Sequence, residues 1–381
     1  MEEKFSINDI RYMARALEIA KKGEGSASPN PMVGAVLVKN NEIIGEGYHK
    51  FYGGPHAEVY ALKKAGQKAN NADIYLTLEP CSHYGKTPPC ANKLIEAGIK
   101  RAVIAMVDPN PEVSGRGIEL LKEAGIEVEV GLMAEKAKEL NEVFLKYITS
   151  EFPFVYLKKA QTLDGFIASS TGHSKWITNE KARLEGHKLR HKVDAIMVGI
   201  GTVLADDPSL TTRLAEQKGI DSLRVILDPN LEMPLDAKII NQESTASTLL
   251  IVSQANLENN ADSIQKKKEK ILAKNNVEII GVPAEKNEIL DLESILKKLH
   301  DLKISSILLE GGAKLSYSFL KKGLVDKLYY FIAPKIYGGN DGISSFCGKG
   351  PKLMSDSKDI KILDRKFLDD NILLIAKVKE Q

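Results

Sequence analysis

The sequence contains few cysteines and no long apolar segment, and each absence excludes a class of protein. Three cysteines among 381 residues are too few for a disulfide framework. They indicate a reducing compartment, so we expect a cytoplasmic protein. No segment approaches the ~18 consecutive apolar residues of a membrane-spanning helix. The first ten residues include acidic groups and no apolar run, so we expect neither a signal peptide nor a membrane anchor.

The sequence also lacks a strong excess of charge of one sign. Its formal net charge is +2, of which residues 1–150 contribute −1 and residues 151–381 contribute +3. A protein that binds nucleic acid or a membrane surface usually concentrates a basic excess in one region. We therefore expect a small-molecule substrate, and neither a nucleic acid nor a membrane as a partner.

The length and composition indicate a folded protein of two domains. A chain of 381 residues exceeds one ordinary core, and 43% apolar with 27% charged residues is typical of globular proteins. A helical run over residues 134–149 is followed by Ser150-Glu151-Phe152-Pro153, and a new strand begins at Phe154. We place the boundary there, which gives domains at 1–150 and 151–381.

Predicted strands and helices alternate in both halves. Apolar residues at helical spacing predict a first helix over 7–22, and a hairpin of two strands follows. In the first half, strands are predicted at 33–38, 42–48, 73–78, 101–107 and 127–130, and helices at 56–65, after Pro89 and at 117–124. In the second half, strands are predicted at 154–159, 195–198, 224–227, 248–252, 277–282, 306–309 and 327–333. This alternation predicts α/β sheets covered by helices, with functional groups at the carboxyl ends of strands.

One histidine and two cysteines lie at the ends of predicted elements. His56 opens a helix, Cys81 follows a strand, and Cys90 begins the next helix. An imidazole and two thiolates suit Zn²⁺, and three protein ligands leave the fourth tetrahedral position open, as in catalytic sites. The positive end of a helix favours the thiolate form that a metal requires. The three residues therefore predict a catalytic zinc site.

Glu58 lies two residues after His56, so both side chains can reach one site from the first turn of the helix. A carboxylate there can take a proton from water and deliver it to a leaving amino group. His-x-Glu followed by Pro-Cys-x-x-Cys is typical of zinc nucleobase deaminases, but here eight residues separate the cysteines. The alternative is that both cysteines are buried small apolar residues and His56 is a core histidine. The polar segment between the cysteines argues against that alternative.

Longer motifs resemble those of the bifunctional deaminase/reductases of riboflavin biosynthesis, including the eight-residue spacing. In the first half the motifs are Ser28-Pro29-Asn30-Pro31-x-Val33-Gly34-Ala35, His56-Ala57-Glu58 and Glu79-Pro80-Cys81-Ser82-His83-Tyr84-Gly85-Lys86-Thr87-Pro88-Pro89-Cys90. In the second half they are Thr162-Leu163-Asp164-Gly165, Ser174-Lys175-Trp176-Ile177-Thr178, Gly201-Thr202-Val203-Leu204-Ala205-Asp206-Asp207-Pro208 and Glu310-Gly311-Gly312. The resemblance implies a cytidine-deaminase-like three-layer α/β/α domain followed by a dihydrofolate-reductase-like α/β domain.

By this resemblance, the first domain would use zinc to deaminate 2,5-diamino-6-(5-phosphoribosylamino)pyrimidin-4-one. The second would use NADPH to reduce the ribosyl group, giving 5-amino-6-(5-phosphoribitylamino)uracil. The resemblance assigns zinc ligation to His56, Cys81 and Cys90 and the proton shuttle to Glu58. It assigns contacts with the pyrimidine or its phosphate to Asn30, His49, His83 and Lys86. We also expect a homo-oligomer.

In the second domain the resemblance divides the site between NADPH and substrate. The residues assigned to NADPH are Gln161, Trp176, Thr202, Asp206 and Gly312. The residues assigned to the substrate are Ser174, Arg190, Leu210, Arg213 and Glu310. Two arginines can bind a phosphate through paired hydrogen bonds. The residues alone also allow Trp176 to be a partly buried aromatic anchor, since tryptophan is usually buried.

Other features limit the interpretation of the second half. Gly199-Ile200-Gly201-Thr202 lacks the third glycine of a dinucleotide-binding fingerprint, which argues against a Rossmann domain. Gly311 and Gly312 follow a predicted strand, and glycines at a helix start let backbone N–H groups approach a phosphate. We expect a solvated surface helix in the lysine-rich segment 256–276 and a structural role for Cys347.

Two other functions are consistent with the residues alone. The first half could deaminate a nucleoside or a tRNA, with the second half as a recognition module, although such a module should be more basic than +3. The second half could also be a catalytically silent module for nucleotide binding or oligomerisation.

Overall fold

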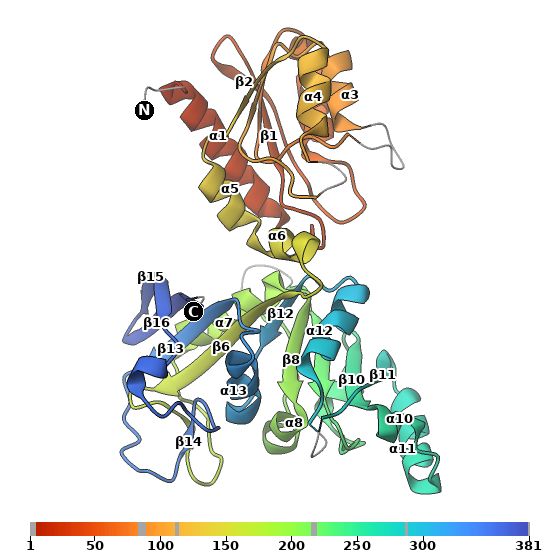
Figure 1. The fold of residues 1–381 in the computed structure, drawn as a ribbon, viewed down its shortest axis with the longest axis vertical. Helices are drawn as coiled ribbons and strands as arrows, with labels where there is room; N and C mark the ends of the chain where they lie inside the picture. The colour runs from red at the N-terminus through yellow and green to blue at the C-terminus, as the bar shows by residue number, and fades with distance from the viewer. Residues whose placement is uncertain (1–4, 83–88, 111–113, 215–218, 286–288, 380–381) are drawn as a thin grey trace. The chain divides into compact units, whose positions relative to one another are not determined.

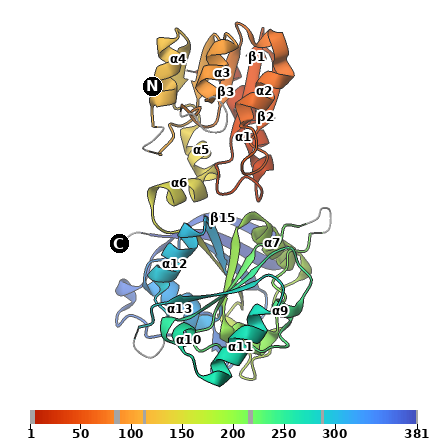
Figure 2. The same ribbon diagram turned by 90° about the vertical axis from the view of Figure 1, so that its right-hand side faces the viewer.

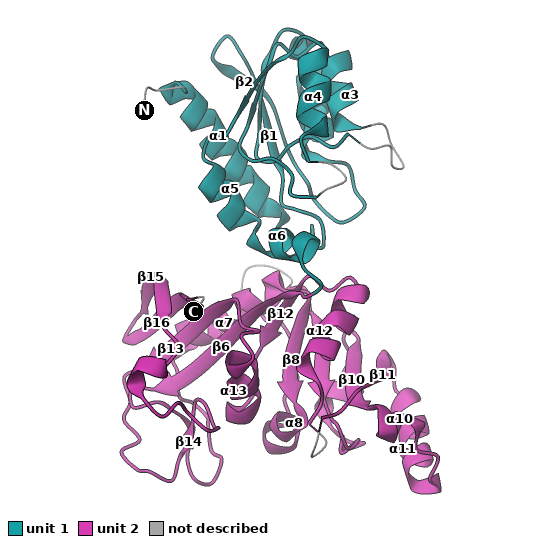
Figure 3. Cartoon of the chain, in the orientation of Figure 1, with its two compact units in different colours: residues 1–151 teal, residues 152–381 magenta. Residues whose placement is uncertain are grey.

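The computed structural model describes residues 5–82, 89–110, 114–214, 219–285 and 289–379, and the chain separates into two compact units. Unit 1 is Met1–Glu151 and unit 2 is Phe152–Gln381 (Figure 3). Each unit has its own β-sheet and its own helices (Figure 1). Within the described residues, no helix combines the length and apolar character that crossing a membrane requires.

The described part of unit 1 contains a five-stranded sheet in the order β2-β1-β3-β4-β5. The hairpin β1–β2 is antiparallel, β1 also pairs antiparallel with β3, and β3, β4 and β5 are parallel. The strands are β1 (Gly34–Lys39), β2 (Glu42–Tyr48), β3 (Asp73–Leu76), β4 (Arg101–Ile104) and β5 (Glu127–Val130). All five lie where the sequence predicted them, but β3 and β4 end earlier than expected.

Helices cover both faces of this sheet (Figures 1 and 2). They are α1 (Ile7–Ala20), α2 (Ala57–Ala65), α3 (Cys90–Glu96), α4 (Arg116–Glu123), α5 (Ala134–Leu140) and α6 (Glu142–Thr149). One apolar core joins α2, α3 and α4 to one face of the sheet, and a second joins α1 and α5 to the other. The strands alternate between these cores, with Ala35 and Leu37 in the first and Val36 and Val38 in the second. The three-layer α/β/α arrangement confirms the expected fold class.

The predicted helical run 134–149 is instead two helices that meet at Asn141. The backbone of Asn141 leaves the helical region, with φ −107° and ψ 22°. Its buried amide accepts a hydrogen bond from the Met32 N–H at 2.8 Å and donates one to the Met32 carbonyl at 3.0 Å. Through these two hydrogen bonds, Asn141 holds in place the segment before β1, which includes Asn30.

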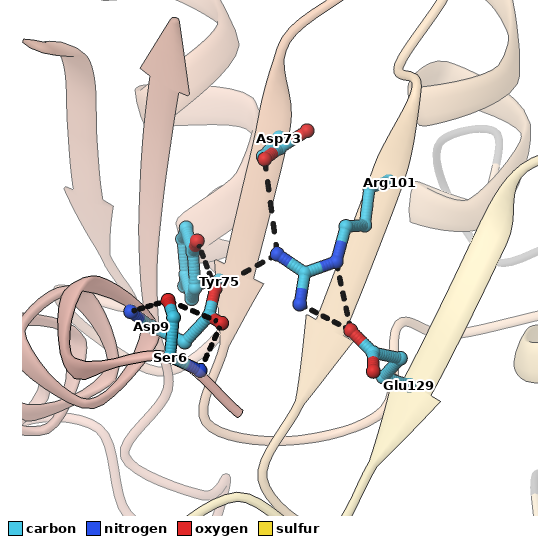
Figure 4. Close-up of polar contacts among 6 residues, drawn as sticks. All are labelled: Ser6, Asp9, Asp73, Tyr75, Arg101 and Glu129. Carbon is cyan, nitrogen blue, oxygen red and sulfur yellow. Dashed lines mark hydrogen bonds and ion pairs between the residues drawn. The ribbon is translucent and has the colours of Figure 1, made fainter. Parts of the chain in front are cut away.

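A polar network ties the start of α1 to the parallel strands (Figure 4). Ser6 and Asp9 form a capping box at the start of α1. The Asp9 carboxylate also accepts hydrogen bonds from the Tyr75 hydroxyl at 2.6 Å and from Arg101 at 2.8 Å, and Arg101 pairs with Glu129 on β5. Burial raises the pKa of Asp9, but the hydrogen bonds from Arg101, Tyr75 and Ser6 outweigh it and hold the pKa well below its usual range.

The described part of unit 2 contains a nine-stranded mixed sheet in the order β11-β10-β9-β8-β12-β6-β13-β16-β15. The strands from β11 to β13 in this order are parallel, and β16 and β15 complete the sheet as an antiparallel pair. The parallel strands are β6 (Phe154–Thr162), β8 (Ala195–Gly199), β9 (Leu223–Leu227), β10 (Thr248–Ser253), β11 (Val277–Val282), β12 (Ser306–Leu309) and β13 (Lys327–Ala333). All seven correspond to predicted strands.

The rest of unit 2 comprises helices and shorter strands. The helices are α7 (Glu180–Lys192), α8 (Ile200–Asp206), α9 (Lys238–Asn241), α10 (Gln254–Glu258), α11 (Asp262–Leu272), α12 (Leu292–Asp301) and α13 (Ala313–Lys321). The remaining strands are β7 (Phe166–Ala168), β14 (Ile343–Ser344), β15 (Ile360–Leu368) and β16 (Asn371–Val378). A buried core joins α12 and α13 to the parallel strands. The lysine-rich segment 256–276 includes most of α10 and all of α11.

The hairpin of β15 and β16 was not predicted from the sequence. The side chains of β15 are exposed over residues 360–367, because the strand lies at an edge of the sheet. The sequence of β15 mixes charged and apolar residues without the run of apolar residues that marked the central strands, although β16 does contain such a run at residues 372–376. An edge strand gives a weak signal of this kind.

Replacing Arg101 with methionine should lower the free energy of unfolding of unit 1. Removal of the cation leaves Asp9 and Glu129 without their partner in a mostly buried site, which costs about 2–4 kcal/mol. Chemical denaturation followed by circular dichroism measures the loss.

The same loss should depend on pH in a defined direction. Because the folded-state pKa of Asp9 is depressed, its stabilising effect is present above the unfolded pKa of ~3.9 and is lost as the pH falls through the folded value. The difference between the wild type and Arg101→Met should therefore shrink below pH ~4. A difference that stays constant down to pH ~2 would contradict the role given to Asp9.

Candidate functional site

The three predicted metal ligands of unit 1 meet at one point. Their ligand atoms all lie within 4.8 Å of one another. His56 Nδ1 lies 3.5 Å from Cys81 Sγ and 3.3 Å from Cys90 Sγ. His56 is the N-cap of α2 and Cys90 is the first residue of α3, while Cys81 follows β3. Two helix starts and one strand end therefore converge on the same site.

The local electrostatics suit a cation. The main-chain N–H of Cys90 donates a hydrogen bond to Cys81 Sγ at 3.3 Å, as expected for an acceptor with thiolate character. Hydrogen bonding from the Cys90 thiol and from His56 lowers the pKa of Cys81. All three cysteines of the chain carry free thiols, and Cys347 is exposed. The donor set of one nitrogen and two sulfurs is the one that tetrahedral zinc accepts.

Glu58 lies in the first turn of α2, directly beside this cluster. Its side chain is 3% exposed, and within the described part of the chain its Oε2 atom has no hydrogen-bond partner. Burial raises the pKa of Glu58. A buried carboxyl oxygen without a partner is costly unless a ligand completes its hydrogen bonding. Glu58 therefore has the raised pKa and the free oxygen of a group that exchanges protons with a ligand.

Asn30 and His49 form a second polar group next to the cluster. The His49 ring is buried and stands edge-on to the His56 ring, with centroids 5.7 Å apart. His49 Nδ1 lies 3.1 Å from the Pro55 carbonyl, which only accepts, so Nδ1 carries the proton. His49 Nε2 then accepts from Asn30 Nδ2 at 3.1 Å. This arrangement leaves the Asn30 Oδ1 atom as an acceptor. His83 and Lys86 lie outside the described residues.

Unit 2 contains a cavity of about 610 Å³ at the carboxyl ends of β8 and β12, beside α7 and α8. Most residues predicted for this half lie on its wall. They are Ser174, Trp176, Arg190, Thr202, Asp206, Leu210, Arg213, Glu310 and Gly312. Gln161 is not part of the wall, and its side chain accepts a hydrogen bond from the Ser345 hydroxyl. Its assignment to NADPH stays a prediction.

Arg190 and Glu310 form a largely buried ion pair in this wall. Arg190 Nε donates to Glu310 Oε1 at 3.0 Å and a terminal nitrogen donates to Oε2 at 2.7 Å. Another guanidinium N–H donates to the Thr211 carbonyl at 2.9 Å. Burial raises the pKa of Glu310, but the charges of Arg190 and Lys158 outweigh it and lower the pKa to about 2. Much of the hydrogen bonding of Arg190, which we expected to be available for a phosphate, is therefore used by the protein.

The side chain of Trp176 is 63% exposed, which argues against the alternative that it is a partly buried aromatic anchor. The Arg183 guanidinium lies 4.5 Å from the centre of its ring, and both residues line the cavity. Gly312 is the N-cap of α13 and has no side chain to cover the first backbone N–H groups of that helix. An exposed ring and an uncapped helix start are suitable for a planar group and a phosphate.

Several basic residues of the cavity were not predicted from the sequence. Those on the wall are Lys158, Lys159, Lys175, Arg183 and Lys238, and His187 lies beside them. Positive charge spread over separate segments gives no local excess along the sequence. His187 is half-buried on α7, and its Nδ1 accepts a hydrogen bond from the main-chain N–H of Arg213 at 3.3 Å.

Comparison with known proteins gives the same order of domains. A model described as the cytidine and deoxycytidylate deaminase zinc-binding region matches residues 6–106, and the RibD C-terminal domain matches residues 153–367. Riboflavin biosynthesis protein RibD of Aquifex aeolicus is 48% identical over 336 residues, covering 88% of this chain and 89% of that protein.

Solved structures extend the likeness to three dimensions. The chain is similar to RibD of Acinetobacter baumannii, with a TM-score of 0.86 and 38% identity over 98% of this chain and 99% of that one. It is also similar to a diaminohydroxyphosphoribosylaminopyrimidine deaminase/5-amino-6-(5-phosphoribosylamino)uracil reductase of Thermotoga maritima. The TM-score there is 0.80 at 37% identity, with 98% and 99% of the two chains covered.

The environment of His187 predicts its protonation state. Burial and the charges of Arg190 and Arg213 lower the pKa of His187 to about 4. We expect a ¹⁵N NMR titration to show a neutral ring between pH 5.5 and 8, protonated at Nε2, with the resonance assigned by its loss in His187→Gln. A midpoint near the ordinary value of ~6.5 would contradict this environment.

Proposed function

This chain belongs to the RibD family of bifunctional riboflavin biosynthesis enzymes, and we propose that its two units divide the family's deaminase and reductase reactions between them. Unit 1 would carry the zinc-dependent deamination and unit 2 the NADPH-dependent reduction. The observation that supports this most strongly is the convergence of His56, Cys81 and Cys90 beside the partnerless oxygen of Glu58.

In unit 1, His56, Cys81 and Cys90 would hold the zinc. The metal supplies Lewis-acid activation of water. Glu58 would accept a proton from that water and pass it to the amino group as it leaves as ammonia. Its raised pKa matches this task, because burial makes the carboxylate a stronger base and therefore better able to take up the proton that it later delivers. Asn30, through its Oδ1, would accept an N–H of the pyrimidine.

The substrate that we propose is a phosphorylated aminopyrimidine, 2,5-diamino-6-(5-phosphoribosylamino)pyrimidin-4-one. The name of the Thermotoga maritima relative supports this choice. His49 would orient Asn30 through the hydrogen bond between them. His83 and Lys86, which lie outside the described residues, remain predicted contacts of the phosphate or the ring.

In unit 2, NADPH supplies the hydride that converts the ribosyl group into ribityl. The chain would bind and orient the two reactants in the cavity and exclude water. Trp176, Thr202, Asp206 and Gly312 would contact NADPH, and the remaining wall residues Ser174, Arg190, Leu210, Arg213 and Glu310 would contact the substrate. Because Glu310 already binds Arg190, we propose that this pair presents a fixed edge to the ribosyl group. The more exposed Arg213 would meet the phosphate.

Two expectations about the whole protein stay predictions. The free thiols of all three cysteines suit the reducing cytoplasm that we propose as its location. A homo-oligomer remains the expected state of assembly.

Glu58→Gln should abolish deaminase turnover without removing zinc. The three ligands remain, while the amide cannot shuttle a proton, so the deaminase kcat should fall by about 10²–10⁴-fold. Metal analysis and chromatographic detection of the deaminated product measure the two properties. The exposed Glu96→Gln on α3 is the matched control and should keep both. Loss of zinc together with the glutamate would contradict the proposed role.

Arg190→Lys should damage the reductase alone. A lysine cannot make the paired hydrogen bonds with Glu310 and still reach the Thr211 carbonyl, so the cavity wall loses its fixed geometry. We expect kcat/KM for the phosphorylated uracil to fall at least about tenfold in an NADPH oxidation assay, with deaminase activity unchanged. Lys188→Arg, on an exposed face of the same helix, is the control. Equal rates for the two variants would refute the assignment.

A further inference from the structure

A buried carboxylate lies two residues before the zinc ligand Cys81. Glu79 is 4% exposed, and its two carboxylate oxygens accept hydrogen bonds from four main-chain N–H groups. The donors are Asp108 at 3.1 Å, Gly115 at 3.0 Å, Gly117 at 2.9 Å and Ile118 at 3.3 Å. The carboxylate therefore joins the end of β3 to the segment after β4 and to the start of α4.

These contacts replace an ordinary helix cap. The N-cap of α4 is Gly115, which has φ +82° and no side chain that could accept from the first N–H groups of the helix. Glu79 supplies that acceptor from the segment that follows β3. A carboxylate that caps the start of a helix in this way is held by several charge-assisted hydrogen bonds at once.

The residue between Glu79 and Cys81 is also fixed. A Cβ atom at Gly117 would lie 2.0 Å from the Pro80 carbonyl oxygen, so α4 packs directly against this turn. The main-chain N–H of Glu79 donates to the Met106 carbonyl at 3.0 Å. The turn that carries Cys81 is thus held on one side by the segment 106–118.

Cys81 itself is held on its other side by α3. Its carbonyl accepts from the Ala91 N–H at 3.2 Å, and its Sγ accepts from the Cys90 N–H at 3.3 Å. The position of the sulfur relative to His56 therefore depends on two supports, α3 and the Glu79 carboxylate. Of these, Glu79 is the one whose removal leaves every metal ligand in place.

We propose that Glu79 is a positioning residue for the zinc centre, and that its four hydrogen bonds set the place of the Cys81 sulfur. This inference rests on the proposed zinc site. Removal of a residue that does not bind the metal but orients one of its ligands typically weakens metal affinity by about 10–100-fold. The effect should reach the metal without any change in the ligands themselves.

Glu79→Gln is the direct test. An amide oxygen can accept from only part of this set, and the NH₂ group would face N–H donors. We expect the zinc dissociation constant of the full-length protein, measured by chelator competition, to rise about 10–100-fold. The cobalt-substituted protein should show altered ligand-field and thiolate charge-transfer bands. Both readouts report the metal centre without using enzyme activity.

Asp9→Asn is the matched control. Asp9 is also a buried carboxylate of unit 1 with several hydrogen-bond donors, but it lies at the start of α1, away from the metal ligands. It should lower the stability of unit 1 and leave the zinc affinity and the cobalt spectrum unchanged. A general loss of stability would instead affect the zinc affinity of both variants to the same extent.

The outcomes are distinguishable. Weaker zinc binding and a changed cobalt spectrum in Glu79→Gln but not in Asp9→Asn support the proposal, and unchanged or equal effects overturn it. If Glu79→Gln does not fold, Gly117→Ala displaces the same turn through Pro80 while keeping the carboxylate, and the same two readouts decide. Failure of the wild type to bind zinc would refute the proposed function instead.

Discussion

The candidate site of unit 1 depends on bringing two sulfur atoms and one imidazole nitrogen within 4.8 Å of one another. The start of α2, the segment after β3 and the start of α3 supply these three ligand atoms. The helix starts favour the anionic sulfur that a cation requires, and the apolar cores on both faces of the sheet hold the helices in place. The candidate chemistry of this unit follows from that convergence.

Three buried carboxylates and the largely buried Glu310 differ in how completely the protein satisfies their hydrogen bonding. Asp9 receives a guanidinium and two hydroxyls, Glu79 receives four main-chain N–H groups, and Glu310 receives a guanidinium in a paired arrangement. Among the described residues, Glu58 keeps an oxygen without a partner. Burial at such a cost is characteristic of a group that completes its hydrogen bonds only with a ligand.

In unit 2, as in unit 1, the candidate site lies at the ends of strands, but it is a cavity for larger ligands and not a metal site. Its cavity lies at the carboxyl ends of parallel strands, where side chains from separate strands, helices and loops contribute positive charge around Glu310. The pair of Arg190 and Glu310 shows that a predicted binding residue can be engaged by the protein itself. Such a pair fixes the wall of the cavity and leaves the more exposed Arg213 to meet an anion.

The sequence by itself determined the features that short-range patterns carry. The spacing of His56, Glu58, Cys81 and Cys90 indicated the metal site, and runs of apolar residues marked the central strands, because local geometry and burial control both. Only the tertiary structure decided the long-range partners. Arg190 meets Glu310 across 120 positions, and Glu79 meets amides 29 to 39 positions later. Strand order sets these distances in space, and no local pattern records strand order. The edge strand β15 was missed for a related reason, since an exposed strand is specified by its neighbour more than by its own residues. Its partner β16 does carry a local apolar run, at residues 372–376.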